Sequence, residues 1–274
     1  MYVLPFIMSF KENYINEYFD LMEYSYNITK DNLISNINLS TMTFVCDLGV
    51  TINLENLTMN FNSPSYPLCV IKKAKSNKHV FYTKRGKVKK SFYNQTTISY
   101  NLNNNVSVKV FTNGKLQLTG ITSINNCLSA IGIIILILKR SEGALQNVIP
   151  CIENVTNMSI EMINSNFNIK KELDLKKMRS ILINENVDFN YEPDTYPGIN
   201  AKINKISVFI FGTGNIVITG AKSLKCIEKT YRYICNLLLS NTHIYLKDGK
   251  GLKKSKKLIN YTQGYPEHMC ESCF

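Results

Sequence analysis

A near-duplication inside the chain constrains its fold more than any other feature. The segment 108–121 (VKVFTNGKLQLTGI) can be laid over the segment 208–221 (VFIFGTGNIVITGA) at an offset of 100 residues. Each copy reads as a strand, a tight turn built on glycine and a second strand, which is the pattern of a β-hairpin. An apolar stretch of helical length follows each hairpin, at 124–138 and at 224–239. The sequence therefore predicts a hairpin followed by a helix, twice.

The two faces of each predicted hairpin differ in chemistry, because side chains alternate between faces along a strand. One face is aliphatic, with Val108, Val110, Leu116 and Leu118 in the first copy and Ile210, Ile216 and Ile218 in the second. The other face carries Lys109, Phe111, Gln117 and Thr119 in the first copy and Phe209, Phe211, Val217 and Thr219 in the second. Helices should cover the aliphatic face. The other face then exposes aromatic side chains, as binding sites do, unless another segment such as the N-terminal one covers it.

A second pair of matching positions precedes the hairpins. Tyr66-Pro67 and Tyr196-Pro197 are each expected to begin a strand, where proline is tolerated. We expect the first of these strands to pair with the strand that ends at Phe111, and the second with the strand that ends at Phe211. Antiparallel pairing brings the far ends of two strands together. Each repeat would then place a tyrosine beside a phenylalanine at one end of the sheet.

These motifs resemble those of the TATA-binding protein family. The resemblance rests on residues 191–198 (YEPDTYPG) and 209–222 (FIFGTGNIVITGAK), which are similar to the YEPELFPG and LIF-x-SGK-x-VLTGAK segments of the family's second repeat. It spans about residues 38–240, with weaker matches in the first repeat. A divergent member from a large DNA virus, or a divergent eukaryotic one, would explain both the loose motifs and the abundance of asparagine. The resemblance implies an α+β fold: a two-repeat saddle with one curved antiparallel sheet, a concave DNA-binding face and helices on the convex face.

The resemblance also implies which residues contact double-stranded, AT-rich promoter DNA in the minor groove. Four aromatic side chains would kink the DNA, namely Tyr66, Phe111, Tyr196 and Phe211. The concave floor would consist of Phe209, Val217, Thr219, Gln117 and Thr119. Apolar and threonine side chains suit the acceptor-only minor groove of A·T pairs. Flexible steps such as TA unstack most readily around a wedge.

The sequence departs from the family pattern at Thr41 and at Lys109, and tyrosine replaces phenylalanine at two of the four kinking positions. Thr41 stands where the family places a central-groove asparagine, and Asn157 is the candidate for that role in the second repeat. Lys109 stands where the family has an apolar side chain. Lys109 would either reach a DNA phosphate or weaken the grip of its half of the saddle. We therefore expect a sequence preference different from a standard TATA element.

The function implied by the resemblance is that of a transcription initiation factor that binds and bends promoter DNA. Glu192 and Asp194 match the second-repeat stirrup, the loop that contacts a TFIIB-like factor and so brings in the RNA polymerase machinery. The alternative is a protein-interaction platform with the same fold and without tight DNA binding. No enzyme is expected, because none of the three histidines accompanies a nucleophile motif and no Walker-type loop occurs. Neither a cofactor nor a small-molecule substrate is implied.

Four segments follow from the repeat. They are an acidic, aromatic N-terminal extension (1–37), repeat 1 (38–140) with a basic insertion at about 72–105, repeat 2 (141–246) and a lysine-rich tail (247–274). The chain has a net charge of +12, to which Lys72–Lys90 contributes +9 and Lys247–Lys257 contributes +5. The rest therefore has a net charge of −2. Both basic segments are candidate phosphate-binding arms, and the alternative for the first is a solvated loop.

The N-terminal extension carries Ile15, Tyr18, Phe19 and Met22 at the spacing of one apolar face of a helix. This helix would either dock onto the protein's own helices, bind a partner, or cover the concave face in competition with DNA.

The remaining features exclude several classes. The longest apolar stretch, Ala130–Leu138, is far below the roughly 18 to 20 residues of a membrane span. The N-terminus lacks the basic region of a signal peptide, so we expect an intracellular protein of the nucleus or, for a virus, of a cytoplasmic replication site or the virion. The eight scattered cysteines are expected to be reduced thiols. His268, Cys270 and Cys273 form at most half a zinc site, so no metal is expected.

Overall fold

The computed structural model describes residues 4–29, 33–59, 69–73, 94–101, 105–146 and 148–245. Within them the strands form one antiparallel 10-stranded sheet. The strands are β1 (Asn38–Asp47), β2 (Cys69–Lys73), β3 (Gln95–Asn101), β4 (Asn105–Phe111), β5 (Lys115–Ile121), β6 (Thr156–Asn168), β7 (Asp188–Asn190), β8 (Gly198–Ile203), β9 (Ile206–Phe211) and β10 (Asn215–Ala221). The helices are α1 (Leu4–Ile28), α2 (Leu54–Met59), α3 (Ile124–Arg140), α4 (Leu175–Asn184) and α5 (Leu224–Ser240), with short 3-10 turns η2 (Ile152–Asn154) and η3 (Thr242–Ile244).

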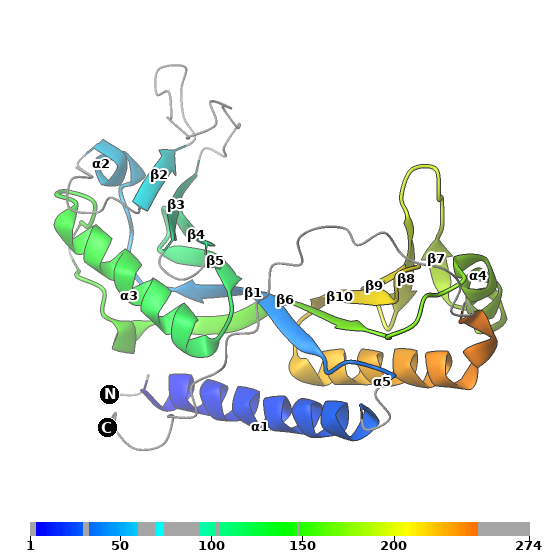
Figure 1. Cartoon of the computed structure of the whole chain (residues 1–274). Coiled ribbons are helices and arrows are strands. Elements are labelled where there is room, and N and C mark those ends of the chain that lie inside the picture. The colour runs from blue at the N-terminus through cyan, green and yellow to red at the C-terminus, as the bar shows by residue number, and fades with distance from the viewer. Residues whose placement is uncertain are drawn as a thin grey trace.

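The strand order is symmetric about the centre of the sheet (Figure 1). It runs β2-β3-β4-β5-β1-β6-β10-β9-β8-β7, so each strand of one half has a counterpart in the other and β1 pairs with β6 in the middle. Each half contains a hairpin followed by a long helix, β4-β5-α3 and β9-β10-α5. The expected α+β saddle with an internal repeat is confirmed.

Alternation along the hairpins places the two sets of side chains as the sequence predicts. The aliphatic residues of β4, β5, β9 and β10 named above are at most 1% exposed and belong to the core. Their neighbours, including Phe111, Gln117, Phe209 and Val217, stay half-buried on the opposite face. The two faces of the sheet therefore have separate roles, one in the core and one open.

Two long helices cover the core face of the sheet. Ser123 caps α3 by accepting a hydrogen bond from the backbone N–H of Asn126 at 3.1 Å, and Ser223 caps α5 in the same way through Cys226 at 3.2 Å. Leu224, Ile227, Ile234 and Leu238 of α5 are fully buried. The serine caps begin both helices at equivalent points after the hairpins, which keeps the two halves alike.

Helix α1 lies on the same side of the sheet, beside α5 and beneath the central strands (Figure 1). The Phe10 ring lies edge-on to Phe44 of β1 with centroids 6.3 Å apart, and Tyr14 Oη donates to Met42 Sδ at 3.6 Å. Phe44 and Met42 belong to the core. The N-terminal helix therefore docks onto the protein's own core side, and the hypothesis that it covers the open face is wrong.

The pairing in the first half differs from expectation. β2 pairs with β3, and only β3 pairs with β4. The strand after Tyr66 is therefore an outer strand, the counterpart of β7, and β3 takes the place that we expected for it. Residues 95–101, expected within the basic insertion, are a sheet strand. The boundaries of the four predicted segments otherwise stay predictions.

Five cysteines are free thiols, namely Cys46, Cys127, Cys151, Cys226 and Cys235. Cys46, Cys127 and Cys235 are buried, and burial raises the pKa of both Cys46 and Cys235 to about 12. Among the described residues, no helix is long and apolar enough to cross a membrane.

Candidate nucleic-acid interface

The open face of the second half ends in an aromatic cluster. Tyr196 lies just before β8, and its ring centroid is 5.9 Å from those of Phe209 and Phe211. Tyr196 is 41% exposed. Gly198 lies opposite Phe211, and a Cβ added there would come within 2.9 Å of the Phe211 ring. A residue without a side chain at position 198 therefore lets this ring lie flat against β8.

The open face of the first half is more polar. Lys109 lies opposite Gln117 on β4 and β5, and Thr119 donates a hydrogen bond to the Ser107 carbonyl at 3.0 Å. A hollow of about 480 Å³ adjoins this region, and Phe111, Gln117 and Asn157 are among its lining residues. Phe111 and Gln117 therefore lie together at this end, as the repeat predicts.

At the centre, three polar side chains form a row across β1, β6 and β10. Asn164 Nδ2 donates to Thr41 Oγ1 at 3.1 Å, and Thr219 Oγ1 donates to Asn164 Oδ1. Asn164 sits between the two halves and is not among the residues predicted from the sequence. Alternation along β6 could have found it, since buried Ser165 and Phe167 place Asn164 and Asn166 on the open face.

The central position of the second half is not occupied by Asn157. Met42 pairs with Ile121 and Ile163 pairs with Ala221, so the counterpart of Thr41 is the residue before Ile163, which is Met162. Asn157 lies at the start of β6, in the same hollow as Phe111. The strand register therefore does not align Asn157 with Thr41.

The strand register also indicates which residue of the first half corresponds to Tyr196. Gln95 faces Phe111 as Gly198 faces Phe211. Two residues before Gly198 stands Tyr196, and two residues before Gln95 stands Tyr93. The counterpart of Tyr196 in the chain is therefore Tyr93 and not Tyr66; both Tyr66 and Tyr93 lie outside the described residues.

The loop between β7 and β8 presents the two acidic residues expected to bind a partner. Glu192 and Asp194 are both exposed. The Glu192 carbonyl accepts hydrogen bonds from the backbone N–H groups of Thr195 at 3.0 Å and Tyr196 at 2.9 Å. This turn fixes the approach to Tyr196. The equivalent connection between β2 and β3 contains most of the basic segment Lys72–Lys90, and most of that segment lies outside the described residues.

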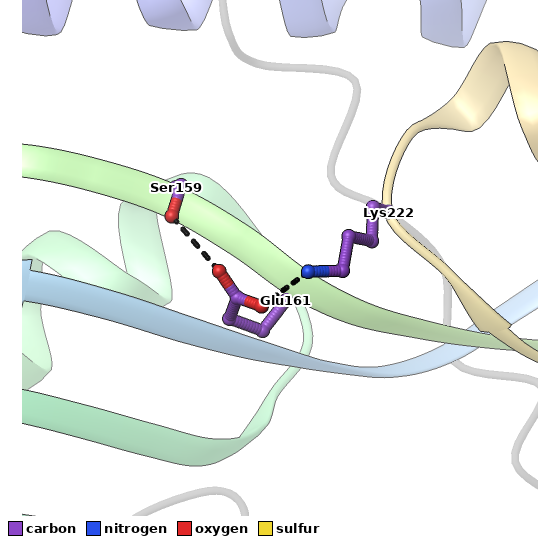
Figure 2. Close-up of polar contacts among 3 residues, drawn as sticks. All are labelled: Ser159, Glu161 and Lys222. Carbon is purple, nitrogen blue, oxygen red and sulfur yellow. Dashed lines mark hydrogen bonds and ion pairs between the residues drawn. The ribbon is translucent and has the colours of Figure 1, made fainter.

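A polar contact links β6 to the segment between β10 and α5 (Figure 2). Lys222 Nζ lies 2.7 Å from Glu161 Oε2, and Ser159 Oγ donates to Glu161 Oε1 at 3.3 Å. The hydrogen bond from Lys222 holds the pKa of the Glu161 carboxyl below its usual value. The charge of Lys222 is therefore partly neutralised within the protein.

Metal ligation finds no support in the parts of the chain that the structure describes, where no group of three or more His, Cys, Asp or Glu residues could hold an ion. His268, Cys270 and Cys273 lie outside those parts.

The fold and the open face define a class: a two-repeat α+β saddle whose concave sheet surface presents aromatic side chains at one end and polar ones at the other. Residues 157–240 match the family described as "Transcription factor TFIID (or TATA-binding protein, TBP)". A TATA-box-binding protein-like protein of Acanthamoeba polyphaga mimivirus is 30% identical over 262 residues, covering 82% of this chain and 71% of that protein. The chain therefore belongs to the TATA-box-binding protein family.

A second relative and a solved structure are also TATA-box-binding proteins. The TATA-box-binding protein of Methanothermobacter thermautotrophicus is 31% identical over 134 residues, covering 47% of this chain and 68% of that protein. The solved structure of Methanococcus jannaschii TBP has the same fold, with a TM-score of 0.55 and 22% identity over 74% of this chain and 98% of that one. Members of this family are DNA-binding transcription factors and not enzymes. The identification as a divergent, virus-type member is confirmed by the mimivirus relative.

Proposed function

We propose that this protein is a transcription initiation factor that binds AT-rich promoter DNA in the minor groove and bends it. The observation that carries the proposal is the cluster of Tyr196, Phe209 and Phe211 at the end of an open sheet face. Aromatic wedges inserted between base pairs unstack them and kink the duplex. The exposed Tyr196 ring, supported by two phenylalanines, has the size and support that a wedge requires.

The wedges of the second half are Tyr196 and Phe211. In the first half they are Phe111 and, by the strand register, Tyr93 in place of Tyr66. The floor between them consists of Phe209, Val217, Thr219, Gln117 and Thr119, with Thr41 and Asn164 at the centre. Lys109 adds a positive charge to the first half.

The exposed β7-β8 loop is the proposed contact for other proteins of transcription. Glu192 and Asp194 carry two negative charges on a turn that is held by backbone hydrogen bonds. A TFIIB-like factor with a basic surface would bind there and bring in RNA polymerase. Because this loop lies outside the sheet floor, the partner and DNA would be bound at the same time.

The test is a bending experiment on an AT-rich duplex with a fluorophore at each end. Energy transfer and affinity are measured for the wild type, for Phe111→Ala with Phe211→Ala, and for Phe19→Ala as a matched control. Phe19 is 65% exposed on α1, on the side away from the open face. We expect bending by the wild type and the control, and loss of bending in the double variant.

Two results would count against DNA bending. Strong binding without a change in energy transfer, or no binding to the duplex, would favour the alternative of a protein-interaction platform. The polar pair Lys109 and Gln117 on the floor of the first half is the feature that favours this alternative.

A further inference from the structure

The two halves of the open face differ at one pair of cross-strand neighbours. On β9 and β10, Phe209 lies opposite Val217. At the equivalent places on β4 and β5, Lys109 lies opposite Gln117. All four side chains are half-buried on the open face. A symmetric backbone therefore presents an apolar pair to one half of a bound duplex and an ammonium with a carboxamide to the other.

The minor groove gives this difference a chemical meaning. A·T and T·A pairs present only acceptors there, whereas a G·C pair adds the guanine N2 amine as a donor. Directly against the Phe209 and Val217 side chains that donor would lose its water and gain no acceptor, which is unfavourable; the neighbouring carboxamides are Asn166, opposite Val217, and Asn200, opposite Phe209. Gln117 Oε1 is an acceptor, and Gln117 Nε2 and Lys109 Nζ are donors for the remaining base acceptors.

The surroundings of the two pairs support the same distinction. Gln117 lines the hollow of about 480 Å³ together with Asn157, a second carboxamide. A smaller hollow of the second half, about 220 Å³, lies at β8 and β9, on the other side of the hairpin, and Tyr196 and Phe209 are among its lining residues. Asn200 also lines it, but the side-chain oxygen of Asn200 is buried. The hollow of the first half is therefore lined by two carboxamide residues, Gln117 and Asn157.

We propose that the protein reads its DNA site asymmetrically: repeat 2 requires A·T pairs, and repeat 1 accepts a G·C pair through Gln117, assisted by Lys109. Gln117 and Lys109 are then specificity-determining residues. This inference rests on the proposed minor-groove binding and adds the composition of each half of the site. It also sets the orientation of the protein, because a half-site containing guanine directs repeat 1 toward itself.

The test uses duplexes built on a palindrome, on which both orientations of the protein are equivalent until one half is changed. One duplex has only A·T pairs, a second series has one G·C pair moved along one half, and a third has that pair in both halves. Wild type can place repeat 1 over a single changed half, so its affinity should stay within about 3-fold of the A·T duplex. The second G·C pair should lower affinity by about 5- to 150-fold, the usual effect of one wrong base pair.

Replacing Lys109 and Gln117 by the residues found at the equivalent places of the second half should remove the tolerance of repeat 1 for a G·C pair. In Lys109→Phe with Gln117→Val, a single G·C pair should already lower affinity by about 5- to 150-fold relative to the affinity of the same variant for the A·T duplex. Gln117→Leu, of nearly the same size, should change affinity in the same direction and serves if the double variant fails to fold. Inosine in place of guanine lacks the N2 amine and should restore binding in every case.

Each outcome decides one of the two proposals. If the wild type does not bind the A·T duplex, minor-groove binding itself is wrong. If it binds and bends that duplex but loses as much affinity from the first G·C pair as from the second, only the asymmetric reading is overturned. Unchanged tolerance in Gln117→Leu would overturn the role of Gln117.

Discussion

A glycine in the turn of each hairpin, Gly114 or Gly214, allows that turn to lie close to the backbone that follows the neighbouring central strand. Gly214 has a φ of +80°, and a Cβ there would lie 2.2 Å from the Ile169 carbonyl oxygen and 2.4 Å from that of Lys171. The Gly214 N–H donates a hydrogen bond to the Phe211 carbonyl at 2.9 Å, and the Gly214 carbonyl accepts one from the Ile169 N–H at 2.9 Å. A Cβ added at Gly114 would likewise lie 2.2 Å from the Val50 carbonyl oxygen.

We expect Gly214→Ala to destabilise the protein by more than about 2 kcal/mol, because left-handed backbone strain adds to a clash with backbone that must move. Gly49→Ala is the matched control, since its φ is +68° and nothing lies within 4 Å of the added Cβ. Gly49→Ala should lose only the stability that left-handed backbone strain costs, about 1–2 kcal/mol. Denaturant unfolding measures the free energy of unfolding of both variants. Equal losses of stability would show that the backbone at Ile169 moves away from the added Cβ without cost.

At the residue scale the alternation of the two hairpins was predictable, and the position of the fourth aromatic was not. The aliphatic and open faces of β4, β5, β9 and β10 follow from period-two patterning alone. The local sequence favours Tyr66 as the counterpart of Tyr196, because a proline follows each of them. Which strand pairs with β4 depends on contacts between distant segments, and those make Tyr93 the counterpart.

Helix α1 shows the same limit at the scale of an element. Four apolar side chains at helical spacing were expected to share its packing face, but Phe19 and Ile15 are exposed whereas Leu21 is fully buried. The helix has apolar side chains on more than one face, so spacing alone does not tell which face docks. Its acidic character has a structural use: Glu17 Oε2 accepts hydrogen bonds from the backbone N–H groups of Leu224 at 2.9 Å and Lys225 at 3.1 Å, at the start of α5.

Leu21→Ala should destabilise the protein by about 2–5 kcal/mol, the range for large-to-small changes in a core. The same substitution should leave DNA affinity unchanged at temperatures where the variant is folded, since α1 lies on the side of the sheet away from the open face. Phe19→Ala, on the same helix, should change stability by less than about 0.5 kcal/mol. Thermal unfolding and fluorescence anisotropy measure the two effects; weaker DNA binding by folded Leu21→Ala would couple α1 to the interface.

At the scale of the whole molecule, charge and shape are carried by different parts of the chain. The two basic segments hold +14 of charge, and everything else has a net charge of −2. The saddle itself is therefore nearly neutral, and its contribution to recognition comes from aromatic and hydrogen-bonding side chains. Salt-sensitive contacts with phosphates are expected to come mainly from the β2-β3 loop and the tail.

Removal of residues 247–274 should reduce the salt dependence of DNA binding and leave the bend angle unchanged. The slope of log affinity against log salt becomes shallower by about 0.9 for each phosphate that the shortened protein no longer neutralises. A salt series with the end-labelled duplex gives the slope and the bend together. An unchanged slope would mean that the tail makes no phosphate contacts, and a smaller bend would contradict the separation of charge and shape.

The sequence by itself determined the duplicated hairpin-helix unit, the alternation of its faces and the family, because those depend on local periodicity and on motifs within single segments. Only the tertiary structure decided which strands meet. That placed Asn164 between Thr41 and Thr219, set β3 and not β2 beside β4, and put α1 beneath the sheet. The physical reason is that register and docking are set by the summed packing of residues more than a hundred positions apart, such as Thr41 with Asn164, which no local pattern contains.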